Sequence, residues 1–135
     1  ESINYGDIKT STKDELAIRL TIIFNKISDL IIEYKPAVLS IEEIFYSNNV
    51  KSSLLLGHAR GVSIAAAAIK NIKVYEYSAK KIKQSLTGNG NAHKEQVKFM
   101  VTNLLKLSEP VKSNDASDAL AIAICYMLQN RLGEL

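Results

Sequence analysis

The chain has 135 residues, of which 47% are hydrophobic and 23% are charged, a balance that excludes a disordered polyelectrolyte and allows one domain with an apolar core. Its one cysteine, Cys125, excludes an intramolecular disulfide and favours a reducing, cytoplasmic setting, in which it would be a small core residue. No stretch reaches about 18 uninterrupted apolar residues and the first residues do not resemble a signal peptide, so we expect a soluble, unexported protein without membrane contact.

The formal net charge of +3 is unevenly distributed along the chain. Residues 51 to 106 carry ten basic and two acidic side chains, a net charge of +8, whereas residues 1 to 50 carry −3 and residues 107 to 135 carry −2. A basic middle beside acidic ends is the polarity that a metal-dependent nuclease needs, because phosphate and cations must be attracted to neighbouring surfaces. A lysine-rich face that contacts only solvent would give the same distribution.

The first segments predict a strand followed by a long helix. Residues 2 to 9 alternate weakly between apolar and polar and indicate an antiparallel strand. Residues 12 to 34 show apolar positions at helical spacing, with Thr12 as N-cap and Glu15 three residues later. We therefore predict an amphipathic helix that ends near Pro36.

Residues 37 to 45 predict a strand that is buried on both faces and stops at two adjacent acids, Glu42 and Glu43. Ligands of open α/β sheets bind at the carboxyl ends of strands, and neighbouring strand residues point to opposite sides. One glutamate is therefore a candidate metal or substrate ligand. Acids at a strand end are also common as solvated loop residues.

Residues 50 to 70 predict a second helix with many small side chains, among them Gly57, Gly61 and the run from Ala65 to Ala68. Small side chains let another backbone approach closely, so this helix either packs tightly on the sheet or forms a partner-binding face. Its basic residues argue against a membrane span.

Residues 73 to 77 predict another strand, after which Ser78 caps a short helix. A glycine turn at residues 87 to 91 separates this helix from the next, which we expect to begin at Ala92. The lysines of both helices would form one basic face that contacts phosphates: Lys80, Lys81, Lys83, Lys94 and Lys98.

Residues 113 to 130 predict a final helix so rich in alanine, leucine and isoleucine that most of it must be buried. Asp115 and Asp118 are three residues apart and share one face of its first turn, so two carboxylates would lie at the mouth of a core. As an alternative without any function, Asp115 would be the N-cap and Asp118 would complement the helix dipole.

The chain resembles the bacterial RuvC family of Holliday-junction resolvases, crossover junction endodeoxyribonucleases, in four segments: SIEEIF at 40 to 45, LGHARG at 56 to 61, VYEYSAKKIKQSLTGNGNAHKEQV at 74 to 97 and DASDALAIA at 115 to 123. The resemblance implies an α/β, ribonuclease-H-like fold with a mixed sheet flanked by helices, in a single nuclease domain over residues 1–135. It also implies a homodimer, Mg²⁺ or Mn²⁺ with two ions per site, and paired hydrolytic cuts in four-way junction DNA during recombination and repair. A branch-migration helicase complex is a further implied partner.

The family's strand glutamate falls on Glu42 and its two helix aspartates fall on Asp115 and Asp118, which the resemblance implies as metal ligands and catalytic residues. Glu43 is then a neighbour and not a ligand. The DNA-contacting positions of the family match the following residues: Lys83, Lys94 and the aromatic Phe45.

One departure from the family concerns the first strand. RuvC-like proteins begin with a strand of the type G-I-D-P-G, whose aspartate completes a four-carboxylate site, and this sequence starts after it. Asp7 does not align with that aspartate and is assigned no role. We expect the native protein to carry the strand. Without it, a non-catalytic, junction-binding dimer is the alternative. Another ribonuclease-H-like nuclease, such as an integrase core, would share the carboxylates but not the lysine segment.

Overall fold

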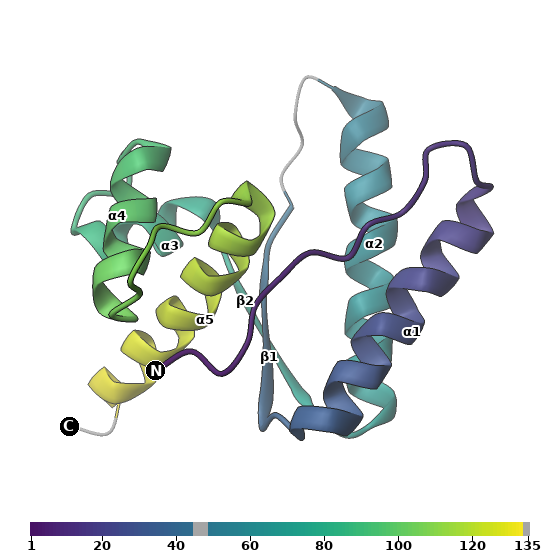
Figure 1. The fold of residues 1–135 in the computed structure, drawn as a ribbon, viewed down its shortest axis with the longest axis horizontal. Coiled ribbons are helices and arrows are strands. Elements are labelled where there is room, and N and C mark those ends of the chain that lie inside the picture. The colour runs from purple at the N-terminus through teal and green to yellow at the C-terminus, as the bar shows by residue number, and fades with distance from the viewer. Residues whose placement is uncertain (45–48, 134–135) are drawn as a thin grey trace. The chain divides into compact units, whose positions relative to one another are not determined.

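A computed structural model of the chain describes residues 1–44 and 49–133 (Figure 1). The elements in chain order are α1 (Leu16–Tyr34), β1 (Val38–Glu42), α2 (Val50–Ile69), β2 (Lys73–Tyr77), α3 (Ala79–Thr87), α4 (Lys94–Leu104) and α5 (Asn114–Gly133). β1 and β2 are hydrogen-bonded neighbours that α2 connects, and both strands run in the same direction in Figure 1. This strand–helix–strand arrangement is the usual way to join parallel strands.

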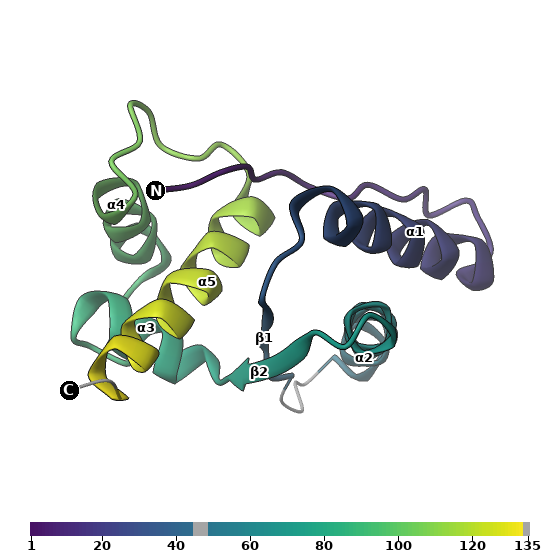
Figure 2. The same cartoon turned by 90° about the horizontal axis from the view of Figure 1, so that it is seen from below.

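The chain forms two compact units. The site unit consists of Glu1–Asp7, Ser40–Glu43 and Glu76–Leu135, and the paired-helix unit consists of Ile8–Leu39 and Ile44–Tyr75. In the site unit α3, α4 and α5 pack together, and in the paired-helix unit α1 lies beside α2 (Figures 1 and 2). One nuclease domain over residues 1–135 stays a prediction.

The apolar core of the site unit lies where α3, α4 and α5 meet. Its buried side chains are Ile82, Leu86, Val97, Val101, Ala121, Ile124 and Cys125. They recur at intervals of three or four residues, so each helix presents one apolar stripe to the other two. The prediction that Cys125 is a small core residue is confirmed, because none of its surface is exposed.

The ends of α3 follow from its sequence. The Ser78 side chain accepts a hydrogen bond of 3.1 Å from the backbone N–H of Lys81, which confirms the predicted cap. At the other end Gly88 adopts the left-handed region, with φ of 79°, and its N–H donates to the Gln84 carbonyl. A glycine adopts this conformation without steric cost. α4 then begins at Lys94, slightly after the predicted start.

The start of α5 involves Ser113, a residue without a predicted role. The Ser113 Oγ accepts a hydrogen bond from the Ala116 N–H and donates one of 2.6 Å to the carboxylate of Asp7. Ser113 is therefore the capping residue, and Asp115 lies within the first turn rather than at the N-cap. The N-terminal segment holds the beginning of α5 through this contact.

Two strand predictions are wrong. Residues 2–9 form no strand, because a weak alternation becomes a strand only when a neighbouring strand supplies hydrogen-bond partners. β1 is half-buried along its whole length instead of buried on both faces. The sheet of the described residues has two strands, so its faces are only partly covered.

The predicted start of the first helix is also wrong. α1 begins at Leu16, its N-cap is Glu15, and no side chain caps it, whereas Thr12 lies in the preceding turn. The predicted end is confirmed. Lys35 adopts the left-handed region, with φ of 46°, because the following Pro36 disfavours a right-handed helical conformation for it.

α2 packs against α1, and the small residues of α2 are divided between a buried and an exposed side. Ala66 and Ala67 are buried. Gly57 and Gly61 face open space, since a Cβ atom at either position would meet nothing within 4 Å. α2 is long enough to cross a membrane, and its most apolar 18-residue window has a mean hydropathy of 1.3. Core helices of soluble proteins can have the same length and hydropathy.

We expect Leu86→Ala, in the core, to lower the free energy of unfolding by about 2–5 kcal/mol through loss of apolar contacts and a residual cavity. The matched change Leu104→Ala, at a side chain that is 43% exposed, should cost under about 1 kcal/mol. Urea unfolding followed by circular dichroism measures both values. Equal losses would contradict the assignment of the core.

Candidate active site

Two of the predicted carboxylates line one cavity of the site unit. Glu42 is the last residue of β1, and Asp118 lies near the start of α5. The cavity has a volume of about 270 Å³. Its apolar lining comes from the helices that form the core, through Ala79, Ile82, Val97, Ala121 and Ile122. The end of β1 and the first turns of α5 therefore bring together two acids that are far apart in the sequence.

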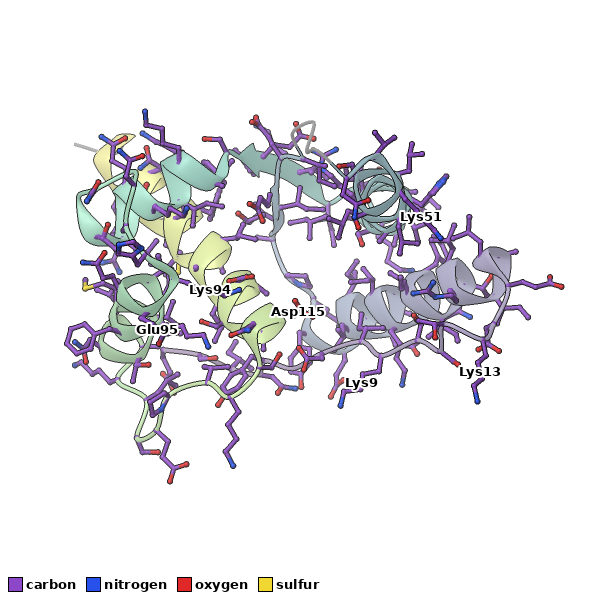
Figure 3. The ribbon with its side chains drawn as sticks, turned by 90° about the horizontal axis from the view of Figure 1, so that it is seen from above. Lys9, Lys13, Lys51, Lys94, Glu95 and Asp115 are labelled. Carbon is purple, nitrogen blue, oxygen red and sulfur yellow. The ribbon has the colours of Figure 1, made fainter. Side chains whose placement is uncertain are left out.

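The third predicted acid, Asp115, is placed differently. It is exposed on the first turn of α5 and does not line this cavity. In Figure 3 it extends from the N-terminal end of α5, and Lys94 lies beside the same helix. Within residues 1–44 and 49–133, no three His, Cys, Asp or Glu side chains are grouped closely enough to hold a metal ion. A role for Asp115 as a ligand stays a prediction.

Two lysines line the same cavity as the carboxylates. Lys83 comes from α3 and Lys94 from α4. The Lys94 Nζ lies 3.8 Å from the Asp118 Oδ2, and both side chains are about half exposed, at 53% and 49%. Water screens a pair of this kind, so it contributes little to stability. Its effect is to place positive charge beside the two acids.

The surroundings of Glu42 change the pKa of its carboxyl group. Burial raises the pKa of Glu42 above its ordinary value, and the nearby Asp118 carboxylate raises it further. Lys83 and Lys94 lower the pKa only in part. Burial is therefore the largest cause of the raised pKa of Glu42, and the charges of the neighbouring side chains act in both directions.

The donor atoms of this cavity fit a divalent metal ion. Carboxylate oxygens are the ligands that Mg²⁺ and Mn²⁺ prefer, and Mg²⁺ is commonly held by one or two carboxylates together with substrate phosphates. A cation beside Glu42 and Asp118 would reduce the repulsion between these two carboxylates. The pair therefore forms a candidate metal site that is open to solvent on one side.

The predicted basic face spans α3 and α4. Three of its lysines, Lys80, Lys81 and Lys94, are exposed, and Lys83 and Lys98 are half-buried. The turn between the helices shapes this face at Lys80, whose aliphatic stem lies over Gly90. A Cβ atom on Gly90 would approach the Lys80 Cγ to 2.7 Å. The face adjoins the cavity, because Lys83 and Lys94 belong to both.

Two further predicted positions are Phe45 and Glu43. Phe45 lies outside the described residues. Glu43 follows β1, and its N–H donates to the Tyr77 carbonyl at 2.8 Å. Glu43 does not line the cavity, and its assignment as a neighbour of a ligand stays a prediction.

The sequence did not single out Ser40. Its Oγ donates a hydrogen bond of 3.0 Å to the backbone carbonyl of Ile122, which ties β1 to α5. The only signal in the sequence was spacing, because Ser40 precedes Glu42 by two residues and therefore shares its face of the strand. Nothing in that spacing identifies the partner.

Comparison with known proteins gives one family. The family model described as "Crossover junction endodeoxyribonuclease RuvC" matches residues 1–126. A protein of that name from Cytophaga hutchinsonii is 49% identical over 127 residues, which are 94% of this chain and 64% of the relative. One from Legionella pneumophila subsp. pneumophila is 48% identical over 134 residues, 98% of this chain and 76% of the relative. The chain thus spans slightly under two thirds of the first relative's length.

Solved structures resemble the chain in the same way. The structure titled "Thermus thermophilus RuvC structure" superposes with a TM-score of 0.86 at 31% identity, and covers 93% of this chain and 76% of the other. The structure titled "T. thermophilus RuvC in complex with Holliday junction substrate" gives a TM-score of 0.89 with the same identity and coverage. These likenesses confirm the α/β, ribonuclease-H-like fold.

Proposed function

The chain belongs to the RuvC family, and from this premise we propose that it is a structure-selective endonuclease that resolves Holliday junctions by metal-dependent hydrolysis of phosphodiester bonds. The observation that carries the proposal is the cavity that Glu42 and Asp118 line together with Lys83 and Lys94. Carboxylates, which can hold cations, lie there beside lysines, which can attract phosphate. Paired cuts in recombination and repair intermediates are the reaction proposed.

The direct test is cleavage of a synthetic four-way junction with Mg²⁺, with linear duplex of the same sequence as control. Paired cuts in the junction alone are expected. Equal cleavage of both substrates would favour another ribonuclease-H-like nuclease. Tight junction binding without cleavage would favour a non-catalytic binding protein, an alternative that the exposed position of Asp115 supports.

The cavity suggests a division of roles between the side chains. Glu42 and Asp118, with Asp115 as a third ligand, would hold Mg²⁺ or Mn²⁺, and we propose two ions per site. When bound, such ions activate water and neutralise charge on the scissile phosphate. Lys83 and Lys94 would orient the DNA backbone so that the phosphate reaches the carboxylates. Positioning and charge neutralisation carry most of the catalysis in such a displacement.

We expect Glu42→Gln, Asp118→Asn and Asp115→Asn each to lower junction cleavage by roughly 100-fold or more, since each removes a negatively charged ligand without changing the shape of the side chain. Junction binding should stay within about twofold, because the basic face is untouched. Cleavage assays and gel-shift titrations measure the two effects separately.

Matched controls are Glu43→Gln and Asp7→Asn. Glu43 adjoins the site without lining the cavity, and Asn at position 7 keeps an oxygen that can accept from Ser113. Both variants should cleave at nearly the rate of the unmodified protein. Cleavage within tenfold of that rate in Glu42→Gln, Asp115→Asn or Asp118→Asn would remove that residue from the site.

The basic face should carry a measurable share of DNA affinity. We expect Lys83→Gln and Lys94→Gln to weaken junction binding and to reduce the slope of log affinity against log salt by about one unit each, because each lost phosphate contact releases one counterion fewer. Lys112→Gln, at an exposed lysine outside the face, is the control. Unchanged slopes in Lys83→Gln and Lys94→Gln would show that these lysines do not contact phosphate.

We also propose that two copies assemble through α2. Its residues Gly57, Gly61 and Ala65 are spaced four apart and form one exposed stripe, which continues to Leu54 with 62% of its surface exposed. Small exposed residues allow close packing of two identical faces. A four-way junction offers two cleavage points related by approximate two-fold symmetry, which a two-fold dimer with one site per copy would match.

We expect Gly61→Leu and Ala65→Leu to shift the dimer toward monomer by at least tenfold in dissociation constant, because bulky side chains would separate the two faces. The fold should survive Gly61→Leu, since a Cβ there meets nothing within 4 Å. Analytical ultracentrifugation with circular dichroism measures assembly and folding. Intact dimers in both variants would contradict this interface, whereas an unfolded Gly61→Leu chain would show that the face is buried in the folded protein.

Two further proposals concern the location of the protein and an additional partner. A cytoplasmic location is consistent with a single cysteine, Cys125, that is buried and unpaired with any other. A branch-migration helicase complex as a partner rests on the family alone.

A further inference from the structure

The contact that links β1 to α5 lies next to the carboxylate pair. Ser40 and Glu42 are two residues apart in β1 and therefore point to the same face of the strand. Ser40 reaches α5 through a hydrogen bond of 3.0 Å from its Oγ to the Ile122 carbonyl. The two residues that this hydrogen bond joins are 82 positions apart in the sequence, so the contact exists only in the folded chain.

The same contact is close to the second carboxylate. Asp118 and Ile122 are four residues apart in α5, hence one turn apart on the same side of the helix, and both line the cavity with Glu42. The helical ladder of α5 uses one lone pair of the Ile122 carbonyl, and the Ser40 hydroxyl can use the other. The hydrogen bond therefore joins strand and helix beside both acids.

The hydrogen bond between Ser40 and Ile122 acts against an electrostatic repulsion beside it. Glu42 and Asp118 carry like charges in a half-buried cavity, and their repulsion favours separation of β1 from α5. In the described sheet β1 has one hydrogen-bonded neighbour, β2. A side-chain hydrogen bond from β1 to α5 opposes the movement that the repulsion favours.

We propose that Ser40 is a positioning residue that sets the separation of Glu42 from Asp118 and thereby the affinity of this pair for a divalent cation. The inference deepens the proposed function, on which it rests, because it concerns the same site. Ser40 is not a catalytic residue, since it contacts the Ile122 backbone and does not line the cavity.

The test compares Ser40→Thr with Ser40→Val. The two side chains have nearly the same shape and both suit a half-buried strand, but only threonine keeps the hydroxyl. Binding of Mg²⁺ to DNA-free protein is measured by titration calorimetry, together with the midpoint of thermal unfolding and junction affinity. We expect the dissociation constant for Mg²⁺ to rise about fivefold in Ser40→Val and to stay within twofold in Ser40→Thr.

Ser63→Ala is the matched control, because it removes another serine hydroxyl that donates to a helix carbonyl, that of Ala59 within α2. It should leave the Mg²⁺ affinity unchanged. Equal Mg²⁺ affinities in Ser40→Thr and Ser40→Val, beside an unmodified protein that binds the ion and cleaves, would overturn the role of Ser40 alone. An unmodified protein that binds no Mg²⁺ would overturn this role and the proposed function together.

Discussion

Two like charges in one half-buried cavity are the constraint on which the arrangement of the site unit depends. Burial raises the pKa of Glu42, and the nearby carboxylate of Asp118 raises it further, so the negative charge of Glu42 is costly in this cavity. Lys83 and Lys94 offset part of this cost, and the Ser40 contact with α5 limits the separation of the acids. An arrangement of this kind persists only if the elements that carry the charges are held rigidly.

The apolar core supplies that rigidity, because the helices of the core also carry three of the charges, those of Lys83, Lys94 and Asp118. In α3, Ile82 belongs to the core and also lines the cavity, which the adjacent Lys83 lines as well. In α4, Val97 lies one turn from Lys94, and both contribute to the cavity lining. The helical period thus fixes each charge relative to a buried side chain. Packing of α3, α4 and α5 therefore determines the electrostatics of the site.

What the sequence could predict followed from local patterns. The stripes of α3, α4 and α5, the Ser78 cap and the buried Cys125 all depend on spacing within a few residues, and the structure confirms them. The predictions that failed, a strand at residues 2–9 and a fully buried β1, depend on distant strands. The acids at the ends of their elements were visible by residue type. Their pairing across the chain followed only from the resemblance to the RuvC family, and the link from Ser40 to α5 followed from neither local pattern nor resemblance.

The position of Lys94 has a consequence for how the site responds to DNA. Its ammonium lies 3.8 Å from the Asp118 carboxylate and also belongs to the face proposed to contact phosphate, so a phosphate and Asp118 would compete for one charge. A phosphate that drew Lys94 away would leave Asp118 and Glu42 with less compensation and would strengthen their attraction for a cation, to an extent that water around the half-exposed pair reduces. DNA and metal would then bind more tightly together than apart, a coupling that arises from a shared lysine and requires no change of fold.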